Sequence, residues 1–544
     1  MTMGARARWF CGLALITACA WSAVPPTQPE TLGEAIYRHG ALPGGEPIRG
    51  ERAAGMYVEG NTAACVNCHR RSGLGMQEGH LTIPPVAGSY LFHPRAGTID
   101  DLDLPFVPGM RADRDPYTDA SLAQAIRDGI GMGGKPLDVL MPRFKLDDAQ
   151  MAALIAYLKQ LSPGAVPGVT DSVLHFATIF TPDSDPVARQ GVLDVLNRFF
   201  EDKNHYTRAE SPRMRSSRRM MFKVNRHWEL HVWQLSGAPD TWEAQLRAKL
   251  QAQPVFAVIS GLGGHTWAPV QRFCEAQQLP CLFPNVDLPV DAESNFETVY
   301  FSRGVLLEAE LMAHALLAMP DKATERKLVQ VYRDGDVGPD AAARLRATLN
   351  GHAWHVISET IPAAASASAL RATLARVGPC DALVLWLRPQ DIAALGPLPA
   401  DVKVVYMSGR MGGLDQAPLP TAWRHLTHMA YPFDLPEHRV VQVDYPLGWF
   451  RLRQIPVVAQ QVQADTYLAC IILSDTLNHM VDTFVRDYLI ERIEEMLEHR
   501  ILTGYYPHLA LAPNQRFASK GGYLAHFAEG TGTRVVADGD WIAP

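Results

Sequence analysis

The segment Cys65-Val66-Asn67-Cys68-His69 has the spacing C-x-x-C-H. The two cysteines lie about one helical turn apart, so both sulfurs can bond the edge of one porphyrin while the adjacent histidine ligates its iron. A zinc site would need a second Cys/His pair at suitable spacing, but the next cysteine is Cys274. A thioredoxin-like redox pair would need a preceding strand, and Gly60-Asn61-Thr62 is not typical of one. The segment therefore predicts covalent attachment of one haem c, with His69 as an axial ligand.

Met141 is the best candidate for the second iron ligand. A thioether is a soft ligand that favours ferrous iron and raises the reduction potential. Pro142 follows it and discourages helix, which would hold the methionine on a loop over the haem face. Asp147 then predicts the N-cap of a helix with a regular apolar pattern. A core methionine is the alternative interpretation, and the rival ligands are Met76, Met110, Met132, His80 and His93.

The order of haem motif, methionine loop and terminal helix resembles a class I cytochrome c over roughly residues 31–162. The resemblance implies a small all-α domain that carries electrons. An iron with two protein ligands leaves no site for peroxide, which disfavours a peroxidase-like enzyme.

The N-terminus predicts export. Arg6 and Arg8 precede an apolar stretch from Trp9 to Ala20 that is too short to span a bilayer. Ala18-Cys19-Ala20 fits a cleavage site, and we favour removal of residues 1–20 as a signal peptide. Residues 16–19 also resemble a bacterial lipobox, which would make Cys19 the site of a lipid anchor. In both cases we expect a periplasmic protein.

Charge and the remaining cysteines restrict the function little further. A net charge of −7 does not indicate nucleic-acid binding. Cys274 and Cys281 flank a predicted helix end, and an oxidising compartment would permit a disulfide between them. The sequence cannot supply the Cα distance that such a bond needs, so two buried thiols remain the alternative.

Residues 163–169 contain two prolines and two glycines at positions 163–168 and predict a linker. Beyond it, apolar runs typical of strands alternate with amphipathic runs typical of helices up to about residue 407. This alternation predicts parallel sheets flanked by helices. Two such series favour two α/β lobes with a cleft between them.

Residues 170–544 resemble the type I periplasmic substrate-binding proteins of the branched-chain amino-acid-binding branch. The segments that carry the resemblance are Val258 to Gly264, Pro280 to Asn285, Tyr300 to Gly304, Ala464 to Ala469 and Gln515 to Tyr523. The resemblance implies discontinuous lobes, one from residues 170–301 and 430–505, the other from 302–429 and 506–544. The whole chain thus resembles bacterial fusions of a class I cytochrome c domain with an ABC transporter substrate-binding domain.

Open α/β sheets bind ligands beyond the carboxyl ends of their strands. The expected ligand-binding residues are Ser260, Gly261, Gly264, Asn285, Asp287, Arg333, Asp334, Arg388 and Ser408. Polar residues at loop ends are often only solvated, which is the alternative interpretation. The arginines make an anionic or neutral ligand as plausible as a zwitterion.

The sequence favours a periplasmic c-type cytochrome that carries electrons and is coupled to a small-ligand-binding or docking domain. The alternative is a solute-binding protein of the ABC-transporter type with an accessory haem domain. The expected partners are a periplasmic redox protein and a small polar ligand. No Ser–His–Asp, paired-carboxylate or phosphate-loop pattern indicates an enzyme.

Overall fold

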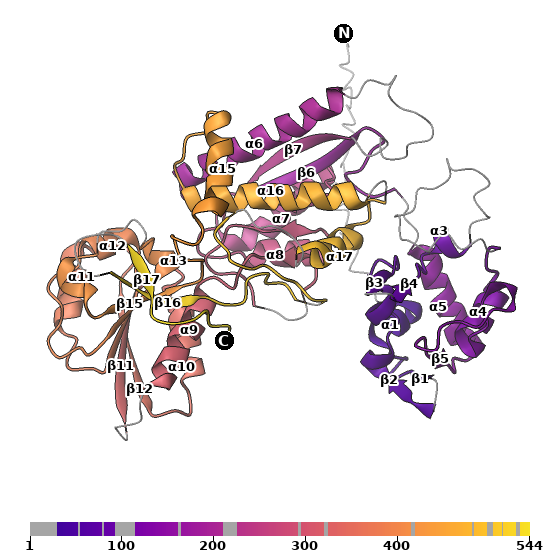
Figure 1. The fold of residues 1–544 in the computed structure, drawn as a ribbon, viewed down its shortest axis with the longest axis horizontal. Coiled ribbons are helices and arrows are strands. Elements are labelled where there is room, and N and C mark those ends of the chain that lie inside the picture. The colour runs from indigo at the N-terminus through magenta and orange to yellow at the C-terminus, as the bar shows by residue number, and fades with distance from the viewer. Residues whose placement is uncertain are drawn as a thin grey trace, which may run out of the picture.

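The computed structural model describes residues 30–52, 55–78, 81–92, 115–161, 165–209, 226–291, 295–319, 325–414, 419–480, 483–497, 504–513, 515–528 and 534–544. The expected signal peptide with Cys19, residues 163–164 of the linker and the rival ligands Met110, His80 and His93 lie outside these ranges. Figure 1 shows an N-terminal part beside two larger α/β lobes. Among the described residues, no helix combines the length and hydropathy needed to span a bilayer.

The N-terminal part consists of short helices around one core. They are α1 (Leu32–His39), α2 (Val66–His69), α3 (Gly88–Leu91), α4 (Asp119–Asp128) and α5 (Asp148–Gln160). The sequence determines where α5 begins, because Asp147 accepts a hydrogen bond from the Gln150 amide and Gln150 bonds back to the Asp147 amide. Helices α1 and α5 pack together, and their buried side chains belong to one apolar cluster that includes Ile36, Leu154 and Leu158.

The expectation of an all-α domain is corrected by two small antiparallel sheets. One has the strand order β2 (Tyr57–Glu59), β1 (Arg49–Glu51), β5 (Arg143–Phe144), and the other pairs β3 (Met76–Glu78) with β4 (Leu81–Ile83). Each strand has only two or three residues. Segments this short carry no recognisable alternation of apolar and polar residues, which is why sequence patterns miss them.

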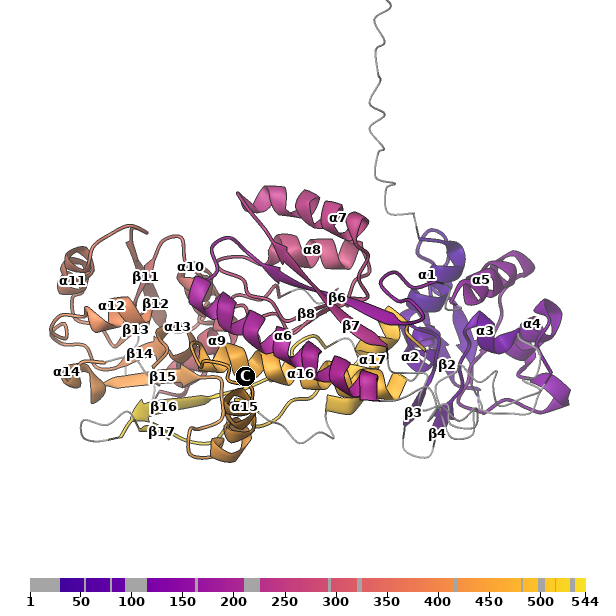
Figure 2. The same cartoon turned by 90° about the horizontal axis from the view of Figure 1, so that it is seen from above.

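The first lobe is a parallel sheet with helices on both faces. Its strand order is β10 (Thr298–Val299), β9 (Cys281–Leu282), β8 (Ala257–Ile259), β6 (Val173–Phe180), β7 (His227–Gln234). Helices α7 (Trp242–Ala252) and α8 (Ala268–Ala276) share one apolar cluster with this sheet. Helix α6 (Pro186–Ala209) covers the opposite face and lies beside α16 (Gln460–Met480), as Figures 1 and 2 show. Helices α15 (Val440–Leu452) and α17 (Arg486–Leu497) flank α16.

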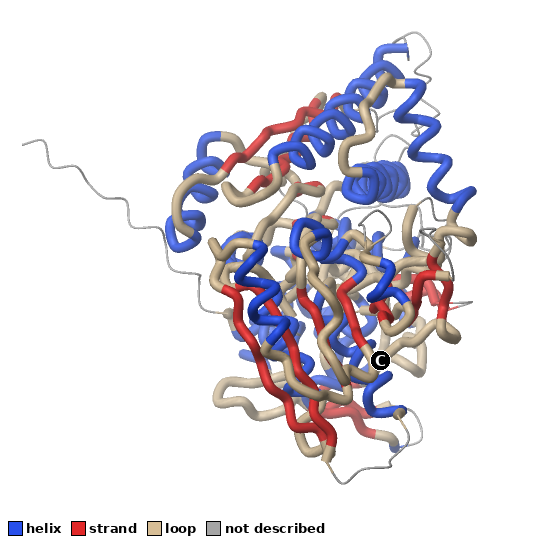
Figure 3. Tube along the Cα trace, turned by 90° about the vertical axis from the view of Figure 1, so that its left-hand side faces the viewer, coloured by secondary structure: helices blue, strands red, loops and turns tan. Residues whose placement is uncertain are grey.

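The second lobe is a seven-stranded sheet. Its order is β12 (Trp354–Ile361), β11 (Arg326–Arg333), β13 (Ala382–Trp386), β14 (Val405–Ser408), β15 (Thr427–Tyr431), β16 (Tyr523–Phe527), β17 (Val535–Ala537). The first five strands are parallel, and the two from the C-terminal segment are antiparallel. Its helices are α9 (Val305–Ala318), α10 (Gly338–Thr348), α11 (Ala367–Ala375), α12 (Pro389–Ala393), α13 (Gly409–Gly412) and α14 (Thr421–Arg424). Figure 3 looks onto this lobe and shows its strands between helices.

Candidate functional site: a haem cavity and a second set of polar loops

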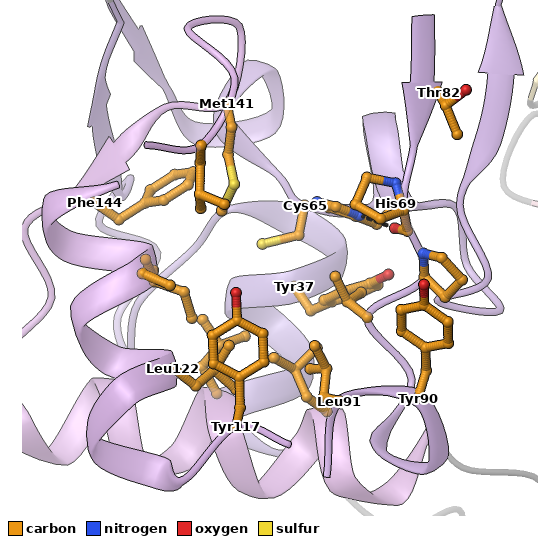
Figure 4. A pocket seen from close by; sticks show the side chains of 18 residues that line it. Tyr37, Cys65, His69, Thr82, Tyr90, Leu91, Tyr117, Leu122, Met141 and Phe144 are labelled. Carbon is orange, nitrogen blue, oxygen red and sulfur yellow. Dashed lines mark hydrogen bonds between the residues drawn. The ribbon is translucent and has the colours of Figure 1, made fainter. Parts of the chain in front are cut away.

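The N-terminal part encloses a cavity of about 380 Å³. The lining residues are Tyr37, Cys65, His69, Thr82, Pro84, Pro85, Val86, Tyr90, Leu91, Tyr117, Leu122, Ala125, Ile126, Leu137, Met141, Phe144, Leu154 and Leu158. Most of these side chains are apolar or aromatic. Figure 4 shows His69 and Met141 on opposite sides, with Cys65 between them.

His69 is the last residue of α2, and its ring is held by one hydrogen bond. Its Nδ1 lies 2.9 Å from the carbonyl oxygen of Pro84, which can only accept, so Nδ1 carries the proton and donates. The lone pair of Nε2 is then left for a metal, the arrangement that orients most ligating histidines. Burial lowers the pKa of His69, which keeps the imidazole neutral.

The two cysteines are held close together by the turn that contains α2. The amides of Cys68 and His69 both donate to the carbonyl oxygen of Cys65, at 3.2 and 2.9 Å. The Cys65 sulfur points into the cavity (Figure 4), and burial raises the pKa of its thiol to about 12. Cys68 is half-buried one turn later. Arg70 ends the turn with a φ of 64°, where the Tyr37 hydroxyl donates to its carbonyl oxygen at 2.7 Å.

Met141 lies on the loop between the short helix Met132–Gly134 and β5. The Arg143 guanidinium donates to the Met141 carbonyl oxygen at 2.5 Å, and the Met141 amide donates to Asp138 at 3.2 Å. The sulfur faces the cavity from the side opposite His69 (Figure 4). Met76 lies in β3, and Met132 lies in the short helix Met132–Gly134. Neither of them lines the cavity. A nitrogen and a sulfur ligand across an apolar cavity with a cysteine at its edge fit a haem.

The second expected site begins with a buried hydrogen-bonded network. The Asn285 side-chain amide donates to the Ser260 hydroxyl at 3.0 Å, to the Gly261 carbonyl oxygen at 3.1 Å and to the Thr466 hydroxyl at 3.3 Å. Ser260 and Thr466 also share a hydrogen bond of 3.0 Å. All three side chains are buried. The structure thus brings Ser260 and Asn285 together, but they bind each other and α16.

Asp287 joins the two lobes. Its carboxylate accepts from Arg388 at 2.7 Å and from Arg410 at 2.9 Å, and Arg388 also binds Asp336 at 2.6 Å. Burial acts to raise the pKa of Asp287, but the two guanidinium groups overcome it and hold that pKa far below its usual range. Asp287 follows β9 in the first lobe, while both arginines follow strands of the second. This ionic contact therefore links loops at the carboxyl ends of the two sheets.

The other expected ligand residues are dispersed. Gly261 adopts a φ of 107°, and the amide of Gly264 donates to Thr181 at 2.9 Å. Arg333 pairs with Asp391 at 2.5 Å, and Asp334 is exposed. The Ser408 hydroxyl donates to Glu308, a buried carboxyl whose pKa burial raises to about 7. Glu308 also accepts from the Arg410 amide at 2.8 Å, so Ser408 is connected to the contact at Asp287, whereas Arg333 pairs within the second lobe.

Sequence reasoning missed Arg410 and Thr466 as members of this region. Arg410 follows the carboxyl end of β14 two residues after Ser408, so the rule that selected Ser408 could have found it. Thr466 lies in the middle of α16, and only the fold brings it to the loops of the first lobe.

Comparison with known proteins decides the nature of the N-terminal part. Residues 59–162 match the cytochrome c family. The chain therefore contains a cytochrome c domain, as its motifs predict, and this family binds haem c covalently. No curated protein matches the sequence.

Over 69% of the chain, the fold is similar to that of a solved periplasmic-type binding protein. A branched-chain amino acid ABC transporter protein from Thermus thermophilus, solved with bound valine, is 10% identical, with a TM-score of 0.52 over 69% of this chain and 97% of that chain. A fatty acid ABC transporter substrate-binding protein from Thermomonospora curvata is 16% identical, with a TM-score of 0.49 over 70% and 95% of the two chains. At 10% identity, the likeness to the Thermus thermophilus protein concerns the fold alone.

The three residues that follow His69 make polar contacts with the first lobe, and Leu74 and Ala87 belong to an apolar cluster shared with it. Arg70 pairs with Glu494, and Arg71 pairs with Asp487 at 3.1 Å. The amide and hydroxyl of Ser72 donate to the Glu491 carboxylate at 2.9 and 2.5 Å. All three acidic residues lie on α17, whose surface at Glu491 and Glu494 is buried. The haem motif and its docking segment are thus continuous in sequence.

Cys274 and Cys281, the pair considered for a disulfide, are both free in this structure. Both are buried reduced thiols, and Cys281 shares a hydrogen bond with Cys274. Burial raises the pKa of Cys274 well above its ordinary value, which leaves it an unreactive thiol.

Proposed function

We propose that the protein is a periplasmic c-type cytochrome that carries electrons through one haem c and is coupled to a small-ligand-binding or docking domain. Cys65 and Cys68 attach the haem, and His69 and Met141 ligate its iron. The observation that carries the proposal is the apolar cavity in which His69 and Met141 face each other beside Cys65. The haem supplies one-electron chemistry when bound.

The residues of the chain favour electron transfer over catalysis. Pro84 orients His69, and Arg143 with Asp138 holds the backbone of Met141. The largely apolar walls would keep water away from a bound haem, and a sulfur ligand would favour the reduced state of its iron. If His69 and Met141 both hold the iron, no coordination position would be left for a substrate.

Haem content and reversibility test the proposal. Protein produced with the cytochrome c maturation machinery should gain the mass of one haem and titrate reversibly as a one-electron centre. Replacing both Cys65 and Cys68 by serine should leave the protein without covalent haem, whereas Cys380→Ser should retain it. Absence of covalent haem from the wild type, or two haems per chain, would refute the assignment.

We also propose that residues 1–20 are removed on export and that the protein resides in the periplasm. The short apolar stretch and the A-x-A pattern at residues 18–20 support cleavage. The intact mass of protein from the periplasmic fraction should correspond to a chain that starts after residue 20. A mass that includes lipid on Cys19 would instead support the lipobox alternative.

For the second domain we propose ligand binding that competes with the ionic contact at Asp287. The fold shared with the valine-bound Thermus thermophilus protein supports a binding domain, and Arg388 is half-exposed at the contact between the lobes. A carboxylate could replace Asp287 at this arginine. The alternative role is that of a solute-binding protein for an ABC transporter, with the haem as an accessory.

A thermal-shift screen of amino acids, carboxylates and alcohols against the full chain tests this role. A binding compound should raise the melting temperature, and Arg388→Ala should abolish the shift, while Arg371→Ala on an exposed part of α11 should keep it. If no compound raises the melting temperature, the domain serves to dock a redox partner.

A further inference from the structure

Three potential metal ligands converge on the first lobe, away from the haem cavity and from the loops at the carboxyl ends. His175 lies on β6, and Glu229 and His231 lie on the edge strand β7. The register places His175 directly opposite Glu229 in this parallel pair. Residues two apart on a strand share a face, so His231 points to the same side as Glu229. Two regular strands (Figure 1) therefore position all three side chains.

The distances among the three groups approach those between the ligand atoms of one metal ion. His175 Nδ1 and His231 Nε2 lie 3.0 Å apart, and the Glu229 carboxylate oxygens lie 3.6 Å from the first and 3.9 Å from the second. Two donor atoms about 2.1 Å from one zinc ion lie about 3.0 to 3.5 Å apart when they subtend 90° to 110°. Half of the Glu229 side chain is exposed, so a small movement can bring its oxygen into this range.

Hydrogen bonding does not account for the carboxylate in this cluster. The two imidazoles share one hydrogen bond, in which one ring donates and the other accepts. The Glu229 oxygens at 3.6 and 3.9 Å are beyond hydrogen-bonding distance of both rings. The Glu229 carboxylate thus faces two ring nitrogens without a hydrogen bond to either. A cation between the three groups could be bound by all of them.

A second cluster, made of two histidines and an aspartate, differs in this respect. His428 and His526 on β15 and β16 both hold the Asp538 carboxylate, at 2.6 and 2.5 Å. Each carboxylate oxygen there already accepts a hydrogen bond from a ring, so the three residues satisfy one another. This second cluster therefore serves as an internal control.

We propose that His175, Glu229 and His231 bind one divalent transition-metal cation of the zinc type. Two imidazoles and a carboxylate are a donor set that zinc accepts, and the exposed side of the cluster leaves a position for water. The His175 amide donates to Gly168 in the linker at 2.9 Å, so the cation would fasten the edge strand β7 beside the entry of the chain into the first lobe.

Calorimetric titration with ZnCl₂ tests the proposal on full-length protein freed of metals by a chelator, because covalent haem survives this treatment. The wild type should bind one equivalent that His231→Ala weakens by more than about 100-fold, since even second-shell changes weaken metal sites by 10–100-fold. Glu229→Gln should also weaken zinc binding, and this half-exposed side chain can be replaced without disturbing the fold. Circular dichroism and haem content check that each variant folds.

The double variant His428→Ala/His526→Ala is the matched control and should bind zinc as the wild type does. The proposal is overturned if the wild type binds no zinc, if His231→Ala and Glu229→Gln bind it unchanged, or if the double variant alone loses it. Electron transfer is not part of the readout, so failure here leaves the proposed function intact.

Discussion

At the scale of single residues, the haem site combines a local motif with a distant ligand. His69 and the two cysteines come from one turn of chain, so their geometry is set as soon as that turn forms. Met141 reaches the same cavity on a loop held by Asp138 and Arg143. In the proposed function, the local group would fix the haem covalently and Met141 would adjust the electronics of its iron. Substitutions at the two places should therefore have different consequences.

We expect Met141→Ala to retain covalent haem but to lose the sulfur ligand. The ferric protein should lose its weak near-infrared band of sulfur-to-iron charge transfer, and the midpoint potential should fall because a thioether favours ferrous iron. Absorption spectra and potentiometric titration measure both. Met132→Ala is the control. A band that persists in Met141→Ala but disappears in Met132→Ala would show that Met132, and not Met141, is the iron ligand.

The Glu491 carboxyl should make the docking of the cytochrome domain sensitive to pH. Burial raises its pKa from the ordinary 4.5 to about 7, despite the opposing effects of Arg70 and Ser72. Because the folded-state pKa is the higher one, this group contributes stability that is complete below about pH 4.5 and is lost as the pH rises through 7. The loss is on the order of 3 kcal/mol at most.

Urea unfolding of the full chain at pH 5 and pH 8 measures this effect. Glu491→Gln should lose less free energy of unfolding than the wild type between these two pH values, since glutamine does not ionise. Glu495→Gln, on the half-exposed side of the same helix, should behave like the wild type. Equal pH dependence in all three proteins would contradict the role of Glu491.

At the scale of elements, the long strands could be predicted from the sequence, but the contacts between the loops that follow them could not. Apolar runs such as Val173–Phe180 and Ala382–Trp386 are long enough to be recognised in sequence, and both are strands of the structure. Polar residues after such strands can be listed, but their partners cannot, because pairing depends on how the lobes face each other. Asp287 and Arg410 meet across 123 positions of chain.

The contact at Asp287 should matter for stability more than surface ion pairs do. Asp287→Ala would leave the largely buried Arg410 without its carboxylate, and we expect a loss of about 2–3 kcal/mol in the free energy of unfolding. Asp291→Ala on the same connection removes more exposed pairs with Arg303 and Arg344 and should cost less than about 1 kcal/mol. Denaturant melts compare the two, and equal losses would show that the contact between the lobes has no special role.

At the scale of the whole molecule, the haem-binding segment is also the docking segment. Arg70, Arg71 and Ser72 directly follow His69 and bind α17 of the first lobe. The type of each domain could be inferred from the sequence, because a short motif and a long alternating pattern are both local. The junction could not be inferred, since Glu491 and Glu494 look in sequence like an ordinary charged helix face. Only the structure shows that both are buried.

Dividing the chain at the linker tests how far the domains depend on each other. We expect fragments of residues 21–165 and 169–544 each to fold, with haem only in the first, because most of each apolar cluster lies within one fragment. Leu74 and Ala87 of the first fragment also join the cluster of the second. The second fragment should be less stable than the same domain in the full chain, since Glu491 loses Ser72 and Glu494 keeps only Arg516, at 2.5 Å. Carboxylates freed from such partners must be hydrated or protonated.

The first fragment added in trans should restore part of the lost stability, and Arg71→Ala in that fragment should weaken the rescue. Differential scanning calorimetry of the second fragment, alone and mixed with each version of the first, measures both effects. An insoluble or molten second fragment would mean that the two domains share a core. A second fragment as stable alone as in the full chain would mean that the contacts of α17 hold the cytochrome domain in place without stabilising the lobe.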